Sequence, residues 1–140
     1  MTTPSQPAAH KQSLAPFRLR RHADFQCAYA AGRKHQSASM SWFLAPQTAG
    51  ISGHAGCRVG FTAGKVLGKA HERNRIKRRL REAIRRHMDL LPPASDLIFH
   101  PRRAVLTLEF GKLEAEVVRI LTQARAEASR APRQTGRDLP

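Results

Sequence analysis

The sequence predicts a small α/β (α+β) protein, a two-layer sandwich in which helices pack on one central mixed sheet. Short apolar segments with period-two alternation are interleaved with longer segments whose apolar residues recur every three or four positions. The 140 residues leave room for one compact domain plus tails, and a hydrophobic fraction of 41% is adequate for one core. We place the domain at residues 16–127 and expect disordered tails at 1–15 and, with basic character, at 128–140.

The first predicted helix covers His22–Ala31. Phe25, Ala28 and Tyr29 are spaced so that they share one face of this helix. Gly32 follows, and a glycine just beyond the last helical turn commonly ends a helix. The pattern therefore predicts a short helix with one partly aromatic face.

Two predicted strands follow this helix. The first covers Ser39–Ala45, where alternation places Trp42 and Phe43 on opposite faces. The second covers Cys57–Ala63, which is rich in residues that favour strands. The segment 47–56 contains three glycines and few apolar residues, so we expect it to form a hairpin loop between the two strands.

The second half of the domain is predicted to contain two long helices and one short strand. A glycine-flanked loop at Gly64–Lys69 leads into a helix at Ala70–Met88. A short buried strand is predicted at Asp96–Phe99, and a last amphipathic helix at Leu108–Glu127. Thr107 precedes this last helix and is its candidate N-cap.

The helix after the glycine loop combines a narrow apolar stripe with many cations. Its apolar residues recur at helical spacing, which predicts one buried face: Ile76, Leu80, Ala83 and Ile84. The remaining surface carries Arg73, Asn74, Arg75, Lys77, Arg78, Arg79, Arg81, Arg85 and Arg86. Glu72 and Glu82 are the acidic residues of this segment, and such crowding of like charges destabilises an isolated helix. We therefore expect a partner outside the chain to offset the charge.

The whole chain is strongly basic. It carries 25 Lys and Arg residues against 10 Asp and Glu residues, which gives a formal net charge of +15. Solubility needs only a few net charges, so this excess favours a polyanionic partner. We expect the partner to be a nucleic acid. A basic helix binds either in the major groove of DNA or along folded RNA, and composition does not choose between the two.

The sequence predicts no catalytic residue and no metal ligand in this chain. The seven histidines lack the paired spacing of metal ligands, and the acidic residues are few and scattered. The loop Gly64–Gly68 lacks the upstream glycine of a nucleotide-binding P-loop, and Val66 stands where Ser or Thr would follow Lys65. A nuclease that acts alone would need clustered carboxylates to hold its metal ions.

The sequence also predicts a compartment. Cys27 and Cys57 have neither disulfide nor metal-ligand spacing, so we expect both to be reduced and buried. Residues 1–7 lack the apolar run of a signal peptide. No stretch approaches the roughly 20 apolar residues of a membrane span. We therefore expect a soluble, cytoplasmic protein without a membrane partner.

Four aromatic residues, Phe25, Tyr29, Trp42 and Phe43, belong to the first helix and the first strand. Aromatic side chains usually pack in the core. A buried Trp42, however, leaves Phe43 on the other side of the sheet. Rings at a sheet surface stack on unpaired bases of single-stranded nucleic acids. From the spacing alone, the core interpretation and the stacking interpretation both remain open.

One continuous block carries a specific motif. It consists of Arg58–Thr62, Lys65 and Gly68–Ala83, in the order strand, loop, helix. The helix contains Arg-Asn-Arg-Ile-Lys-Arg at residues 73–78, followed by Arg-Glu at 81–82. In content and order, this block strongly resembles the bacterial ribonuclease P protein component.

The resemblance covers roughly residues 17–125 and is weaker at Asp24–Gly32 and Asp96–Ile98. The chain departs from the family at Val66, where a second lysine is common. The family's fold is an α/β sandwich whose basic helix connects two parallel strands by a left-handed crossover. The resemblance alone implies this hand, because the right-handed connection is the general rule.

The resemblance also implies a function. Members of the family bind a large catalytic RNA, and together they remove the 5′ leader from precursor tRNA. Magnesium ions held mainly by the RNA perform the hydrolysis. The residues that match the family's RNA-facing helix and loop are Lys65, Lys69, Arg73, Asn74, Arg75, Lys77, Arg78, Arg81 and Arg85. The residues that match the leader-binding cleft are Phe25, Tyr29 and Phe43.

The resemblance thus predicts the RNA-binding subunit of a tRNA-processing endoribonuclease, with the catalytic RNA and precursor tRNA as partners and no DNA partner. Two alternatives belong to other classes. A ribosomal protein with a basic helix would bind ribosomal RNA and leave tRNA processing unchanged. A DNA-binding regulator would need a partner helix beside its recognition helix and a dimer face, and the sequence shows neither.

Overall fold

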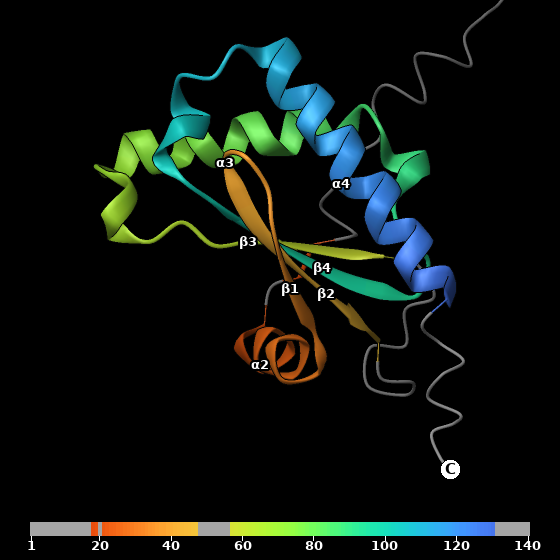
Figure 1. Cartoon of the computed structure of the whole chain (residues 1–140). Helices are drawn as coiled ribbons and strands as arrows, with labels where there is room; N and C mark the ends of the chain where they lie inside the picture. The colour runs from red at the N-terminus through yellow and green to blue at the C-terminus, as the bar shows by residue number, and fades with distance from the viewer. Residues whose placement is uncertain (1–17, 20, 48–56, 131–140) are drawn as a thin grey trace, which may run out of the picture.

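A four-stranded mixed sheet forms the centre of the protein in the computed structural model, which describes residues 18–19, 21–47 and 57–130 (Figure 1). The strand order is β1 (Arg33–Gln36), β2 (Met40–Pro46), β4 (Ser95–Pro101) and β3 (Arg58–Phe61). The β1–β2 and β2–β4 pairs are antiparallel, whereas β3 and β4 are parallel. The predicted central mixed sheet is therefore confirmed.

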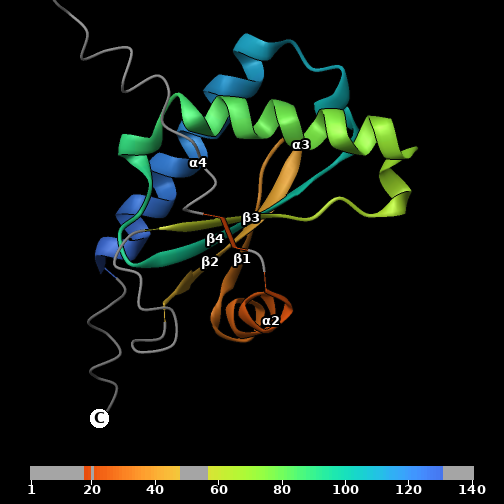
Figure 2. The same cartoon turned by 180° about the vertical axis from the view of Figure 1, so that it is seen from behind.

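Helices cover both faces of this sheet, so the protein has one layer more than the two that the sequence predicts. Helix α2 (His22–Ala31) packs across one face, and α3 (Ala70–Arg85) and α4 (Phe110–Arg130) lie together over the other face (Figures 1 and 2). Short 3₁₀ turns connect these elements at Lys65–Leu67 (η2), Met88–Leu90 (η3) and Arg103–Leu106 (η4). Among the helices described, none has the length and apolar character to cross a membrane.

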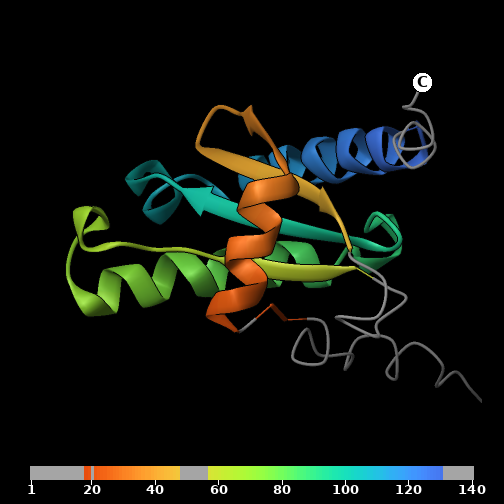
Figure 3. The same ribbon diagram turned by 90° about the horizontal axis from the view of Figure 1, so that it is seen from below.

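The connection from β3 through α3 to β4 joins two parallel neighbours. In Figure 3 both strands run from right to left, α3 lies behind them and β4 lies above β3. Seen from the α3 side with the strands pointing up, β4 therefore lies to the left of β3. This is the left-handed sense, against the usual right-handed rule. The crossover that the family resemblance implies is confirmed.

Alternation along β2 divides the apolar residues into two clusters. Trp42 faces α3 and α4 in the main core, whereas Phe43 faces α2, which confirms that they lie on opposite sides. The main core also contains the largest fully buried side chains of β4, α3 and α4. The smaller cluster under α2 contains Leu19, Ala28, Ala45 and Ile98, with Phe25, Tyr29 and Phe43 packed against it.

Most predicted elements are present with shifted ends. The predicted first helix has the bounds of α2, and the basic helix begins at the predicted residue, Ala70. It ends at Arg85, three residues before the predicted end, because the chain turns into η3. Helix α4 continues to Arg130, past the predicted domain end at residue 127. The predicted N-terminal tail and most of the segment 47–56 lie outside the described residues. The hairpin predicted between the strands on either side of this segment is wrong, because β4 lies between β2 and β3 and pairs with both.

The N-cap predicted at Thr107 is wrong. Thr107 instead follows the 3₁₀ turn η4, and its N–H donates to the carbonyl of Ala104 at 3.2 Å. Helix α4 begins at Phe110, and the Glu109 carbonyl accepts the N–H groups of Lys112 and Leu113.

Strand β1 was not predicted. Its sequence, Arg-Lys-His-Gln, has no apolar residue, so period-two alternation gives no signal. The strand is fixed instead by pairing with β2 and by one side chain. The His35 ring stacks on Trp42 with centroids 4.2 Å apart, and its Nε2 lies 3.0 Å from the Glu127 carboxylate of α4.

The prediction that both cysteines are buried is half wrong. Cys57 is buried, and burial is the largest cause that raises the pKa of its thiol. Cys27 is exposed on α2. It precedes the buried Ala28, and one helical step of about 100° turns it away from the sheet.

Candidate nucleic-acid interface

The apolar stripe of α3 docks the helix on the sheet. Ile76, Leu80, Ala83 and Ile84 are fully buried in the main core, as their spacing predicts. At the N-terminal end, the Glu72 carboxylate accepts the backbone N–H of Lys69 at 2.9 Å. This bond satisfies one of the free donors of the first turn. The helix therefore holds its cations in fixed positions around the buried stripe.

The side of α3 that faces η4 and α4 uses its cations within the fold. Arg79 donates to the carbonyl oxygens of Val105, at 3.0 Å, and Leu108. Arg86 donates to Glu82 at 3.0 Å and lies 4.9 Å from the centre of the Phe110 ring. The sequence placed both arginines on a free surface, but the structure engages both with other groups of the fold, and Arg86 stays 50% exposed.

Arg85 was predicted to face RNA, yet it is paired on its own helix. Its guanidinium donates to the Glu82 carboxylate at 2.8 Å, and Glu82 also accepts from Arg86. The side chain of Arg85 is 32% exposed. A phosphate at this position would have to compete with the carboxylate of Glu82.

The opposite side of α3 presents cations without carboxylate partners among the described residues. Arg73, Lys77 and Arg81 recur every four residues and therefore form a row along the helix, which we call the cation row. Asn74 lies beside it. Lys65 in η2 and Lys69 before the helix are exposed at its N-terminal end. This surface is suited to bind a polyanion such as a nucleic-acid backbone.

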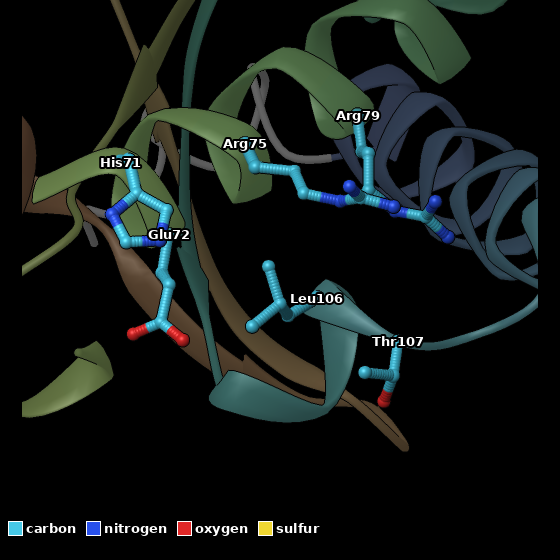
Figure 4. Close-up of a pocket in the computed structure, with 6 residues that line it drawn as sticks. All are labelled: His71, Glu72, Arg75, Arg79, Leu106 and Thr107. Carbon is cyan, nitrogen blue, oxygen red and sulfur yellow. The ribbon is translucent and has the colours of Figure 1, made fainter. Parts of the chain in front are cut away.

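A pocket of about 530 Å³ lies between the N-terminal half of α3 and η4 (Figure 4). Its lining residues are His71, Glu72, Arg75, Arg79, Leu106 and Thr107. The Arg103 guanidinium donates to Glu72 at 2.9 Å, and this bond is the main cause that lowers the pKa of Glu72 to about 2. Burial, followed by the nearby charge of Arg75, lowers the pKa of Arg79. The pocket is therefore cationic, with its acidic residue already paired.

The three predicted cleft aromatics lie together on the other face of the sheet. Tyr29 of α2 meets Phe43 of β2 edge to face, with ring centroids 5.0 Å apart, and Phe25 lies 6.3 Å from Tyr29. His100 of β4 joins them, 5.6 Å from Tyr29 and 5.3 Å from Phe43. We call Phe25, Tyr29, Phe43 and His100 the ring cluster. Its members are partly exposed, so aromatic edges reach the surface.

A glycine in β3 makes room for this cluster. A Cβ added to Gly60 would lie 2.7 Å from two ring atoms of Phe25. Real Cβ atoms do not approach other atoms so closely. Glycine therefore lets the Phe25 ring lie directly against the strand, which positions the ring at the sheet surface.

An ion-paired group fixes α2 next to the ring cluster. Arg58 of β3 donates two hydrogen bonds to Asp96 of β4, at 3.0 and 2.9 Å, and a third to Asp24 of α2 at 3.2 Å. The bonds to Asp96 are the main cause that raises the pKa of Arg58. The side chains of this group are at most 14% exposed. The sequence analysis did not identify this group, because its members are 34 and 38 positions apart.

The described residues contain no cluster of three or more His, Cys, Asp or Glu side chains that could hold a metal ion. The acidic residues that come together are already bonded to arginines, as in Asp24 and Asp96 with Arg58.

Fold and interface together define a basic α/β protein with a cationic helix on one face and an aromatic cluster on the other. The family model described as ribonuclease P matches residues 15–125. The ribonuclease P protein component of Chloroflexus aggregans is 40% identical over 108 residues, which are 76% of each chain. That of a Synechococcus species is 35% identical over 125 residues, covering 89% of this chain and 93% of the relative.

Solved structures show the same fold. The ribonuclease P protein of Staphylococcus aureus matches with a TM-score of 0.66 and 25% identity, over 78% of this chain and 95% of that one. The protein of Thermotoga maritima has a TM-score of 0.66 at 24% identity, over 76% and 96%. The chain belongs to the ribonuclease P protein family, the protein subunits of a tRNA-processing endoribonuclease.

Proposed function

We propose that this protein binds the catalytic RNA of ribonuclease P and the 5′ leader of precursor tRNA, and thereby promotes endonucleolytic removal of the leader. The observation that carries the proposal is the cation row. Arg73, Lys77 and Arg81 are held in register on a docked helix, and no described carboxylate neutralises them. Fixed cations without internal partners are suited to neutralise phosphates.

In this proposal, α3 and its preceding loop contact the catalytic RNA. The residues assigned to this contact are Lys65, Lys69, Arg73, Asn74, Arg75, Lys77, Arg78 and Arg81, with Arg85 available only if Glu82 releases it. Their charge lowers the repulsion between the catalytic RNA and the tRNA, which are both polyanions. Arginine suits this task because its planar guanidinium binds phosphate in a bidentate geometry.

The ring cluster is assigned to the leader. The leader is single-stranded, so its bases are free to stack on Phe25, Tyr29 and Phe43. Stacking tolerates every base, because each base has a π face. Contact with the leader would favour precursor tRNA over mature tRNA, which lacks this segment.

The hydrolysis itself is assigned to magnesium ions held mainly by the catalytic RNA. Magnesium binds preferentially to phosphate oxygens and water and needs few protein ligands. The contribution of this chain is to hold the RNA fold and the leader in place. We assign it to the cytoplasm, where tRNA precursors are processed in bacteria.

A reconstitution experiment tests the proposal. Purified protein, the matching catalytic RNA and a precursor tRNA are combined at low magnesium concentration, beside reactions with protein alone and RNA alone. We expect efficient cleavage at the mature 5′ end only in the complete mixture. Cleavage by the protein alone would overturn the assignment of the chemistry to the RNA. If the protein does not increase cleavage by the RNA, the result would favour the ribosomal alternative.

A further inference from the structure

A chain of polar contacts runs through the ring cluster and joins three elements. The Tyr29 hydroxyl of α2 lies 3.0 Å from Nε2 of His100 in β4. The Thr62 hydroxyl, just after β3, lies 2.9 Å from Nδ1 of the same ring. Both nitrogens of His100 are therefore engaged by hydroxyl groups, and the imidazole bridges the helix to the edge of the sheet.

A neutral imidazole suits this position. In either tautomer it donates one hydrogen bond and accepts the other, and each hydroxyl is able to take the complementary role. Burial, followed by the charge of Lys34 on β1, lowers the pKa of His100. Burial also raises the pKa of Tyr29, so its hydroxyl stays protonated and is able to donate or accept the bond.

The same imidazole contacts both neighbouring rings. Its centroid lies 5.6 Å from Tyr29 and 5.3 Å from Phe43, while these two rings are 5.0 Å apart. The hydroxyl lies on the axis of the second side-chain torsion of tyrosine, so its hydrogen bond holds the position of the ring, and the contacts with Phe43 and His100 limit rotation of the ring plane. The hydrogen bond between Tyr29 and His100, together with the ring contact of His100, therefore holds the Tyr29 ring in place beside Phe43.

We propose that His100 is a positioning residue that holds the Tyr29 ring in the orientation in which it stacks with an unpaired base of the tRNA 5′ leader. This inference rests on the proposed leader role of the ring cluster. Binding groups that are fixed before the ligand arrives lose less conformational entropy on binding, so pre-organisation raises affinity. The predicted ligand of the cluster is thus an RNA base, and His100 acts on it through Tyr29.

The test compares two variants that remove the same bond from its two ends, together with their combination. Tyr29→Phe removes only the hydroxyl, and His100→Leu removes the imidazole while keeping an apolar side chain of similar size. The reconstituted holoenzyme is titrated with precursor tRNA and with mature tRNA. We expect each single variant to weaken precursor binding about threefold to tenfold, the scale of one hydrogen bond. Affinity for mature tRNA should not change.

The double variant separates positioning from independent contacts. If His100 acts through Tyr29, then Tyr29→Phe/His100→Leu should bind the precursor no more weakly than the weaker single variant. Additive losses would overturn the proposal. Ser41→Ala is the matched control, because Ser41 pairs with His100 across β2 and β4 on the same face of the sheet. This control should leave both affinities unchanged.

A further variant distinguishes the positioning role of His100 from the leader role of the ring cluster. Phe25→Ala removes a ring of the cluster without touching the polar chain. If Phe25→Ala lowers precursor affinity selectively and the His100 and Tyr29 variants do not, the positioning proposal fails and the leader role stands. If Phe25→Ala weakens both tRNAs equally, the leader role fails. An equal loss for both tRNAs in the His100 variant, with a lower melting temperature, would show a structural role only.

Discussion

At the scale of single residues, two glycines lie in opposite environments and should respond oppositely to a methyl group. A Cβ on Gly60 would clash with the Phe25 ring at 2.7 Å, whereas a Cβ on Gly111 in α4 would meet its nearest neighbour, Glu109, at 3.8 Å. We expect Gly60→Ala to lower the free energy of unfolding by about 1–3 kcal/mol, as overpacking does. Gly111→Ala should raise it by about 0.5–1 kcal/mol, because alanine loses less backbone entropy in a helix.

Urea denaturation of both variants measures this difference. The changes should have opposite signs, and Gly60→Ala should also alter the near-ultraviolet signal of the aromatic residues around Phe25. A neutral Gly60→Ala variant would show that the ring moves away from β3 without loss of packing.

The environment of His100 also predicts how the stability of the protein responds to acid. Burial and Lys34 lower its pKa in the folded protein, so the unfolded chain binds a proton first as the pH falls. The contribution of His100 to stability should therefore be constant above about pH 6.5 and fall as the pH drops below it toward the folded pKa. Thermal unfolding across this range should show a smaller decrease in His100→Leu than in the unchanged protein. Equal pH profiles would contradict the prediction.

At the scale of elements, a buried carboxylate connects the β1–β2 turn to α4. Glu116 is 2% exposed and accepts hydrogen bonds from the Ser37 hydroxyl at 2.5 Å and from the Ser39 hydroxyl and N–H at 2.7 and 2.9 Å. Burial acts to raise the pKa of Glu116, but these bonds outweigh it and the pKa lies below its usual value. The charged form is therefore part of the native fold.

We expect Glu116→Gln to lower the free energy of unfolding by about 1–3 kcal/mol, because an amide replaces an acceptor of three bonds with a group that also donates. In the unchanged protein, this contribution should be present above about pH 4.3 and fade as the pH falls through the lower folded pKa. Glu109→Gln on the exposed start of the same helix is the control and should change stability by less than about 0.5 kcal/mol. Chemical denaturation at pH values above and below about 4.3 measures the free energy of unfolding of both variants.

The two sides of α3 should separate RNA binding from stability. Lys77→Ala removes a cation of the cation row that has no described carboxylate partner, so it should weaken binding to the catalytic RNA and reduce the salt slope by about one. Arg79→Ala leaves the carbonyls of Val105 and Leu108 without their donor, so it should lower the free energy of unfolding by about 1–3 kcal/mol. Filter binding and denaturation of both variants measure the contrast. A large stability loss in Lys77→Ala would show that the cation row is structural.

At the scale of the whole molecule, the sequence predicts those features whose signal is local. The buried stripe of α3 follows from the spacing of Ile76, Leu80 and Ile84, and the opposite faces of Trp42 and Phe43 follow from strand alternation. Features that depend on distant contacts could not be predicted in this way. Glu116 lies 77 residues from Ser39, and Tyr29 lies 71 residues from His100.

The sequence is limited in the same way in what it predicts about the charged residues of α3. Composition shows that α3 is basic, but not which arginines the fold itself uses, because the acceptors of Arg79 are backbone carbonyls of η4 and the residues after it. Beyond its own helix, Arg86 contacts Glu114 and the Phe110 ring of α4. Which cations of α3 lack a carboxylate partner among the described residues therefore becomes visible only once α4 and η4 are placed beside α3.

The net charge of +15 makes a prediction for the entire protein, because counterion release depends on the number of phosphates neutralised together. If the cation row and its neighbours neutralise about six to ten phosphates, affinity for the catalytic RNA should fall by about 10³–10⁵ between about 50 and 200 mM salt. If the ring cluster stacks on leader bases, as proposed, this contact involves no charge, and the preference for precursor over mature tRNA should change much less with salt. Titrations of holoenzyme assembly and of tRNA binding over one salt series measure the two quantities separately. A preference that collapses with salt as steeply as assembly would mean that phosphates, and not stacked bases, distinguish the precursor.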